Sequence, residues 1–203
     1  MREVDPNPVE GRWIDIGANL TNRAFEADLE SVLEQANAAG VQQIVVTGTS
    51  VDGSRAALAL AHAFPGRLFA TAGVHPHDAR HWDAQCEFVL RTLMTDSKVR
   101  AAGETGLDFN RDFSPRPLQE RVFEAQLELA AESGLPVFVH ERDASARVTS
   151  ILRSQRHRLA DAVIHCFSGD RNALRAYLDL DLYIGITGWV CDERRSQSLQ
   201  QCI

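Results

Sequence analysis

Acidic and imidazole side chains stand at the ends of short apolar runs in this sequence. Glu104, His140 and His165 each close such a run. Imidazole nitrogen and carboxylate oxygen suit zinc, manganese and related ions, and added carboxylates and waters suit magnesium. A bound cation polarises a phosphoryl or carbonyl oxygen and lowers the pKa of bound water. One histidine in such a place is more often structural, but three groups at successive run ends predict a metal or catalytic site.

Two more histidines and two arginines lie close to these run ends. His75 and His77 flank a proline, and a turn there would leave His77 in solvent. Arg111 and Arg142 follow the acidic and imidazole residues closely. Each guanidinium either grips a phosphate through two hydrogen bonds or is a solvated charge.

The elements that must position these residues alternate between apolar runs and helical spacing. Leu118, Val122 and Leu129 recur at helical spacing, and Gly134 fits the end of that helix. Runs without alternation, separated by helices, predict a parallel sheet covered on both faces. The seven runs are residues 13–17, 43–47, 68–74, 99–104, 136–140, 162–165 and 182–186.

Two architectures fit this alternation, an open doubly wound sheet and a (β/α)8 barrel. No G-x-G-x-x-G follows the first run, so dinucleotide binding has no support. The barrel is favoured because active sites form where the carboxyl ends of barrel strands meet. A complete barrel takes about 250 residues, whereas this chain has 203. We therefore expect an α/β fold of (β/α)8 TIM-barrel type with about seven units, incomplete at its C-terminal end.

Bulk composition narrows the class of protein. A net charge of −7 argues against a broad, sequence-blind coating of DNA, but it allows a pocket for one phosphate or strand end. The four cysteines form no C-x-x-C pair, and no signal peptide or membrane span is evident, which favours free thiols in the cytoplasm and no membrane partner. Cys166 is expected to pack away from the site, because side chains alternate along a strand. We expect one domain over residues 1–203, with residues 1–12 flexible.

In combination, four stretches of this sequence resemble the TatD family of metal-dependent deoxyribonucleases, in the amidohydrolase-like barrel superfamily. They are Gly-Val-His-Pro-His at 73–77, Gly-Glu-Thr-Gly-Leu-Asp at 103–108, His-Cys-Phe-Ser-Gly at 165–169 and Tyr-Ile-Gly-Ile-Thr-Gly-Trp at 183–189. The resemblance runs from about residue 13 to residue 195. It implies phosphodiester cleavage supported by Mg2+, with Mn2+ or Zn2+ as alternatives. It also implies 3′-to-5′ exonuclease action on single-stranded DNA, RNA as a further substrate, and a role in DNA repair or degradation.

The resemblance also implies roles for particular residues. Glu104, His140 and His165 are then metal ligands, and Glu104 is also catalytic. His75 and His77 contact the scissile phosphate or assist proton transfer. The substrate-binding residues are Asn19, Asp108, Arg111 and Arg142, of which Asp108 and Arg111 are expected in a loop that shapes the substrate channel.

The chain departs from the family pattern at both ends. Gly17 and Asn19 stand where many members have a His-x-His pair, so Asn19 would make a weak or water-mediated metal contact. Nothing after Asp192 resembles the Glu-Thr-Asp motif of the eighth strand. The last unit is therefore expected to be absent, which exposes the edges of the first and seventh strands. A monomer is expected, with self-association through that open edge as the alternative.

Two other functions remain open at this point. One is a different metal-dependent hydrolase of the same superfamily, acting on an amide or a lactone. The other is a truncated, catalytically silent domain that binds a partner, an alternative motivated by the missing eighth strand.

Overall fold

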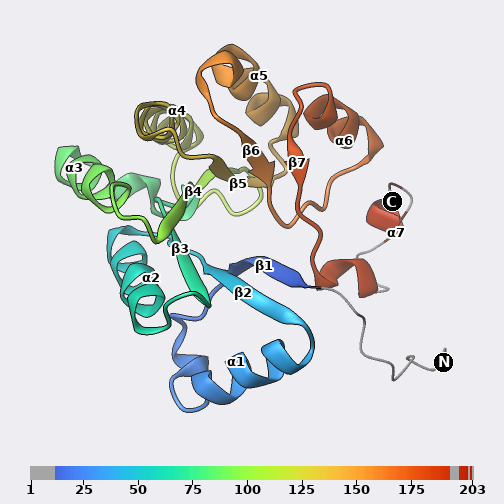
Figure 1. Ribbon diagram of the computed structural model, residues 1–203. Coiled ribbons are helices and arrows are strands. Elements are labelled where there is room, and N and C mark those ends of the chain that lie inside the picture. Colours follow the sequence, from blue (N-terminus) through green and yellow to red (C-terminus); the bar gives the residue numbers. More distant parts are fainter. Residues whose placement is uncertain (1–11, 193–196, 201, 203) are drawn as a thin grey trace.

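Seven parallel strands succeed one another in space in the same order as in the sequence, β1 to β7. The computed structural model describes residues 12–192, 197–200 and 202, so nearly all of the segment expected to be flexible lies outside it. Figure 1 shows the sheet curling so that its strands surround a common centre. The strands are β1 (Trp13–Ala18), β2 (Val41–Val46), β3 (Leu68–Ala72), β4 (Val99–Asp108), β5 (Val137–Arg142), β6 (Ala162–Ile164) and β7 (Tyr183–Ile184).

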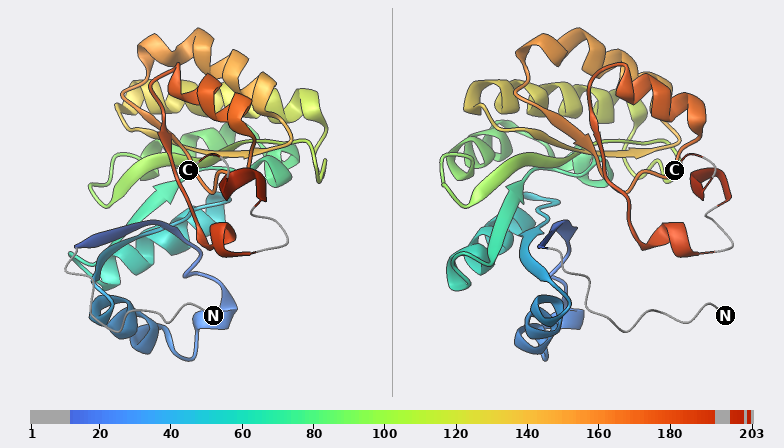
Figure 2. Two further views of the ribbon diagram at one scale, coloured as in Figure 1. Left: turned by 90° about the vertical axis from the view of Figure 1, so that its right-hand side faces the viewer. Right: turned by 45° about the vertical axis from the view of Figure 1, so that its right-hand side comes forward.

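Helices follow the strands and lie on the outer face of the curled sheet (Figures 1 and 2). This arrangement confirms a TIM-barrel-type fold with seven strands in the described part of the chain. The α-helices are α1 (Leu29–Ala38), α2 (Val51–Ala63), α3 (Ala84–Leu93), α4 (Arg116–Ser133), α5 (Ser145–Gln155), α6 (Arg171–Leu178) and α7 (Gln197–Gln200). Four 3-10 helices complete the elements: η1 (Arg23–Phe25), η2 (Pro76–His81), η3 (Arg156–Arg158) and η4 (Gly188–Cys191).

Local sequence signals set the ends of several helices. The side chains of Ser50, Asp83 and Asp170 each accept a hydrogen bond from the backbone N–H three residues later, at the start of α2, α3 and α6. Gly134 ends α4 with a φ of 68°, a left-handed conformation that costs glycine little. These signals place each helix so that the next strand begins within a few residues.

The core lies between the sheet and its helices. Around β4 and β5 it includes Phe123 and Leu127 of α4, both almost fully buried. A smaller cluster around β2 and β3 contains Leu33 and Leu68. Burial of these side chains removes apolar surface from water, which is the main force that holds helices against the sheet.

The first strand has the exposed edge that was expected from an absent eighth strand, although its apolar pattern alone predicted burial. Residues 13–17 were expected to form a buried strand, but Trp13 is 54% exposed and Ile14 is 56% exposed. The reason is that β1 pairs with β2 alone among the described strands, so its other edge has no neighbour there. On the far side of the opening, Tyr183 of β7 is 66% exposed.

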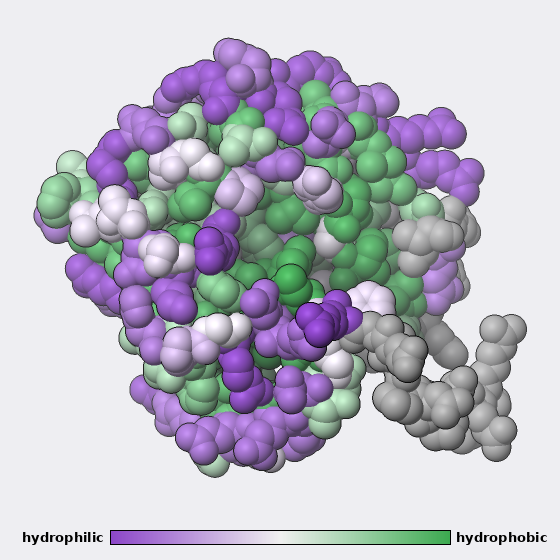
Figure 3. All heavy atoms as spheres, in the orientation of Figure 1, coloured by the Kyte–Doolittle hydropathy of each residue, from purple (hydrophilic) through white to green (hydrophobic). Residues whose placement is uncertain are grey.

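An apolar hollow of about 490 Å³ opens between β1 and β7, lined in part by Ile16, Phe138 and Tyr183. Figure 3, in the orientation of Figure 1, shows hydrophobic residues gathered at the middle of the molecule. Among the described helices, none combines the length and the apolar character needed to cross a membrane.

Candidate metal centre

The carboxyl ends of β3 to β6 bring the predicted ligands together. Glu104 lies within β4, His140 lies within β5, and His165 comes directly after β6. In the register of the sheet, Gly106 of β4 is paired with His140. Because parallel strands end at one rim, these side chains share a single depression despite their separation in sequence.

Two glycines allow the strands to approach closely beside Glu104. A Cβ on Gly73 would lie 2.4 Å from the carbonyl carbon of Gly103. A Cβ on Gly103 would lie 2.3 Å from the carbonyl oxygen of Phe138, and the φ of Gly103 is 146°. Both positions therefore require glycine, and the close contact of β4 with β5 places Glu104 beside His140.

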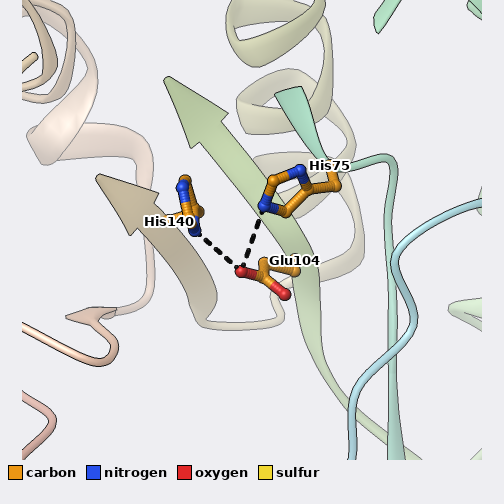
Figure 4. Close-up of side chains that lie close together, drawn as sticks. All are labelled: His75, Glu104 and His140. Atoms are coloured by element: carbon orange, nitrogen blue, oxygen red, sulfur yellow. Dashed lines mark hydrogen bonds and ion pairs between the residues drawn. The ribbon is translucent and has the colours of Figure 1, made fainter. Parts of the chain in front are cut away.

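Three imidazoles surround one oxygen of Glu104. Its Oε1 lies 2.6 Å from His165 Nε2, 3.0 Å from His140 Nδ1 and 3.5 Å from His75 Nε2. Figure 4 shows His75 and His140 both pointing toward one oxygen of this carboxylate. Glu104 itself is only 6% exposed, so the carboxylate sits at the bottom of the depression.

Electrostatics keep this carboxylate ionised. Burial alone would raise the pKa of Glu104, but hydrogen bonds with His140 and His165 outweigh burial and hold that pKa well below its usual range. The pKa of His140 shifts in the opposite direction. Burial disfavours the charged form of His140, but hydrogen bonds with Asp108 and Glu104 outweigh this and raise its pKa to about 9. Without a cation, His140 therefore carries the compensating positive charge.

His75 is the third imidazole beside Glu104, and its charge differs from that of His140. Burial, only partly offset by Glu104, lowers the pKa of His75 to about 3, so this imidazole is neutral. Its Nδ1 accepts a hydrogen bond from the backbone N–H of His77 at 3.1 Å. The proton of neutral His75 must then sit on Nε2, the nitrogen that faces Glu104. A nitrogen that carries a proton cannot coordinate a cation, but it can donate a hydrogen bond.

A second carboxylate lies next to the first. Asp108 Oδ2 is 2.7 Å from His77 Nε2 and 3.4 Å from His140 Nε2. Asp108 is 3% exposed and is the last residue of β4, so the prediction that it lies in a loop is wrong. The strand simply continues past Glu104, and its buried end anchors two histidines. Asp108 also accepts the backbone N–H of Arg111 at 2.8 Å, which starts the loop that follows.

Two buried glutamines of α4 hold the strand ends that carry these groups. The amide of Gln126 bonds both backbone groups of Val74, next to His75. The amide of Gln119 bonds both the N–H and the carbonyl oxygen of Asp108. The two glutamines are seven residues apart, so both lie on the helix face that packs on the sheet.

A pocket of about 500 Å³ contains the whole arrangement. All of the residues predicted for the site line it: Asn19, His75, His77, Glu104, Asp108, Arg111, His140, Arg142 and His165. Apart from Cys166, sequence reasoning missed six of the lining residues: Thr49, Asp78, Asn110, Glu141, Ser168 and Trp189. A signal existed for some of them: Asn110 stands between Asp108 and Arg111, and Ser168 and Trp189 belong to the stretches at 165–169 and 183–189.

The placement predicted for Cys166 is wrong. This cysteine lines the same pocket as His165 instead of packing behind the strand. Strand β6 ends at Ile164, and Cys166 has a φ of 49°, so the strand's alternation does not reach it. Its Sγ lies 3.4 Å from Thr187 Oγ1. The three histidines outside the pocket, His62, His81 and His157, are exposed.

The donor set fits a divalent cation. Ligand atoms of His75, Glu104 and His140 all lie within 4.8 Å of one another, and His165 contacts the same carboxylate oxygen. Imidazole nitrogens beside one ionised carboxylate are the ligand types that zinc, manganese and related ions take in proteins. Glu104 and His140 of this group are predicted ligands, and His165 is the third predicted ligand.

Comparisons with known proteins identify relatives of this chain. The family model described as TatD related DNase matches residues 14–203. A 3′-5′ ssDNA/RNA exonuclease TatD of Edwardsiella piscicida is 51% identical over 187 residues, which cover 92% of this chain and 72% of that protein. The corresponding protein of Musicola paradisiaca is 48% identical over 186 residues, covering 92% of this chain and 70% of that protein.

A solved structure of a TatD homologue is also similar to this chain. The crystal structure of YJJV, a TatD homologue from Escherichia coli, superposes with a TM-score of 0.85 at 30% identity, covering 93% of this chain and 73% of that one. The family model spans almost the entire sequence, and the strand-end carboxylate with its histidines lies within the matched region. The chain therefore belongs to the TatD family of DNase-related, metal-dependent hydrolases.

Proposed function

We propose that this protein is a metal-dependent 3′-to-5′ exonuclease that hydrolyses phosphodiester bonds of single-stranded DNA and accepts RNA. The observation that carries the proposal is the convergence of His140 and His165 on the buried Glu104 carboxylate. The pocket around that carboxylate also presents Arg111 and Arg142, whose guanidiniums match phosphate geometry. The relatives named 3′-5′ ssDNA/RNA exonuclease TatD supply the substrate class and the polarity.

Glu104, His140 and His165 would hold the cation. We take Mg2+ as the physiological ion, with waters completing its coordination, and expect Mn2+ or Zn2+ to bind more tightly through the imidazoles. When bound, the ion polarises the phosphoryl group and lowers the pKa of an attacking water. Asn19 lies at the rim of the same pocket and would reach the ion or the substrate through water.

The remaining groups act on the phosphate and on the leaving oxygen. Neutral His75, with its proton on Nε2, donates a hydrogen bond to a non-bridging phosphate oxygen. His77 is oriented by Asp108 and gives a proton to the 3′ oxygen as the bond from phosphorus to that oxygen breaks. Arg111 and Arg142 hold the phosphates on either side of the reaction. Water supplies the new oxygen on phosphorus, so the product is a nucleoside 5′-monophosphate.

The wider setting is part of the same proposal. We propose a single domain that acts as a monomer in the cytoplasm, in the repair or degradation of DNA. The four cysteines are free thiols, which suits a reducing compartment. Self-association through the exposed edges of β1 and β7 is the alternative, and light scattering over a concentration series distinguishes the two.

Digestion of end-labelled DNA tests the proposed polarity. A 5′-labelled single strand should shorten one nucleotide at a time in Mg2+, and a 3′-labelled strand should release labelled mononucleotide at once. The matching blunt duplex should be degraded much more slowly. Internal cleavage of both labelled strands, or no cleavage in either Mg2+ or Mn2+, would overturn the proposal.

A further inference from the structure

A second hollow, of about 680 Å³, adjoins the metal pocket on the same rim. The two are continuous, because they share the lining residues Asn110, Arg111, Glu141, Arg142, Ser168 and Trp189. We call this hollow the side pocket; its own walls come from Asp143, Ser145, Gly169, Asp170, Ala173 and Leu199. Its volume lies within the range of ligand sites, about 300–1,000 Å³.

The acidic side chains of the side pocket already have partners. Glu141 accepts hydrogen bonds from Tyr177 Oη at 3.0 Å and from the backbone N–H of Ala144 at 2.8 Å. Asp143 accepts the side-chain amide of Asn110 at 2.8 Å. The third acidic residue, Asp170, caps the N-terminus of α6. These carboxylates therefore fix the walls and are poorly placed to receive a ligand's donors.

The two arginines of the side pocket, Arg111 and Arg142, have no acidic partner among the described residues. Arg142 Nη1 donates to Ser168 Oγ at 2.9 Å, which holds the guanidinium over the junction of the two pockets. Across the described residues, neither Arg111 nor Arg142 forms an ion pair with a carboxylate. Two uncompensated guanidiniums beside a metal site suit an anionic group such as a phosphate.

Trp189 supplies an aromatic surface at the same junction. It lies in η4, whose start is fixed by Thr187 accepting the backbone N–H of Trp189. Trp189 is among the lining residues of both pockets and is 42% exposed. An exposed indole beside basic groups is the combination by which proteins hold single-stranded nucleic acid without regard to sequence.

We propose that the side pocket binds the nucleotide adjoining the scissile phosphate, with its base stacked on Trp189 and its phosphate held by Arg111 and Arg142. The inference rests on the proposed nuclease function and adds a subsite to it. It gives a physical reason for a single-strand preference, since a base must leave its own stack before it can lie on the indole.

Equilibrium binding of a fluorescently labelled single-stranded oligothymidylate, measured by anisotropy in EDTA, tests the subsite without turnover. Loss of one base–aromatic stack should weaken binding about 5- to 100-fold in Trp189→Ala. Trp189→Phe should retain most of the affinity. Trp13→Ala is the matched control, because Trp13 is an exposed tryptophan at the opposite end of the strands and should have no effect.

Hydrolysis of bis(p-nitrophenyl) phosphate in Mn2+ provides the second measurement, since this small diester needs only the metal pocket. Trp189→Ala should lower that rate much less than it lowers affinity for the oligonucleotide. Wild-type affinity in Trp189→Ala, an equal loss of diester turnover, or no oligonucleotide binding by the wild type would each overturn the subsite. A wild-type protein that binds the oligonucleotide through Trp189 but hydrolyses neither substrate would instead refute the proposed function alone.

Discussion

The side-chain amide of Gln126 forms two hydrogen bonds with the backbone of Val74. The N–H of Val74 donates to Oε1 at 2.7 Å, and Nε2 donates to the carbonyl oxygen of Val74 at 2.9 Å. The glutamine thus does for the end of β3 what a neighbouring strand would do. Because the next residue is His75, the position of that imidazole depends on a side chain that is 52 residues away from Val74.

Removal of this amide should affect both stability and turnover. Gln126→Leu has a similar volume but leaves two buried backbone groups unpaired, at a cost of about 1–3 kcal/mol each. We expect a lower free energy of unfolding and a kcat at least tenfold lower, with KM for the oligonucleotide little changed, because His75 is displaced while the phosphate-binding arginines stay in place. Chemical denaturation and steady-state kinetics measure the two effects. Gln85→Ala, an exposed glutamine of α3, is the control; unchanged kcat in Gln126→Leu would contradict the positioning role.

His75 and His165 should differ in what their loss removes. His165→Ala should lower Mn2+ affinity at least tenfold, because it removes a proposed ligand. His75→Ala should leave Mn2+ affinity within about threefold, yet lower kcat about 100-fold through loss of a donor to the phosphate. Calorimetric Mn2+ titration beside single-turnover hydrolysis separates the two roles. Equal losses of Mn2+ affinity in both variants would show that His75 is a ligand.

Metal binding should release a proton from His140. Its pKa in the metal-free fold is about 9, above the ordinary 6.5, so the charged pair with Glu104 stabilises the fold fully below about pH 6.5 and is lost as pH rises through about 9. A cation requires the neutral imidazole, so binding at pH 7 should expel nearly one proton, and affinity should rise about tenfold per pH unit between 7 and 8. Mn2+ titration calorimetry in two buffers of different ionisation enthalpy counts the proton. Identical heats in both buffers would contradict this protonation state.

The sequence was informative where chemistry and secondary structure coincide. The carboxylate and histidines at the ends of apolar runs were predicted to share one rim, and the structure brings Glu104, His140 and His165 together. The exposed edge at Ile14 was predicted from the expected absence of the eighth strand and not from the apolar pattern, which records what a strand can bury and says nothing of whether a neighbour is present. Gln126 escaped notice because a glutamine in a helix normally faces water, and only the tertiary fold gives it a buried partner.

The direct test of the central claim is the rate at which mononucleotides leave the 3′ end of a 5′-labelled single strand, compared between the wild type and Glu104→Gln. This substitution keeps the shape of the side chain and removes the charge on which the cation and the histidines converge. With equal folded fractions shown by circular dichroism, we predict Mg2+- or Mn2+-dependent release by the wild type, none in EDTA, and a rate at least 100-fold lower in Glu104→Gln. Equal rates in the two proteins, or release that persists in EDTA, would contradict a metal centre built on Glu104.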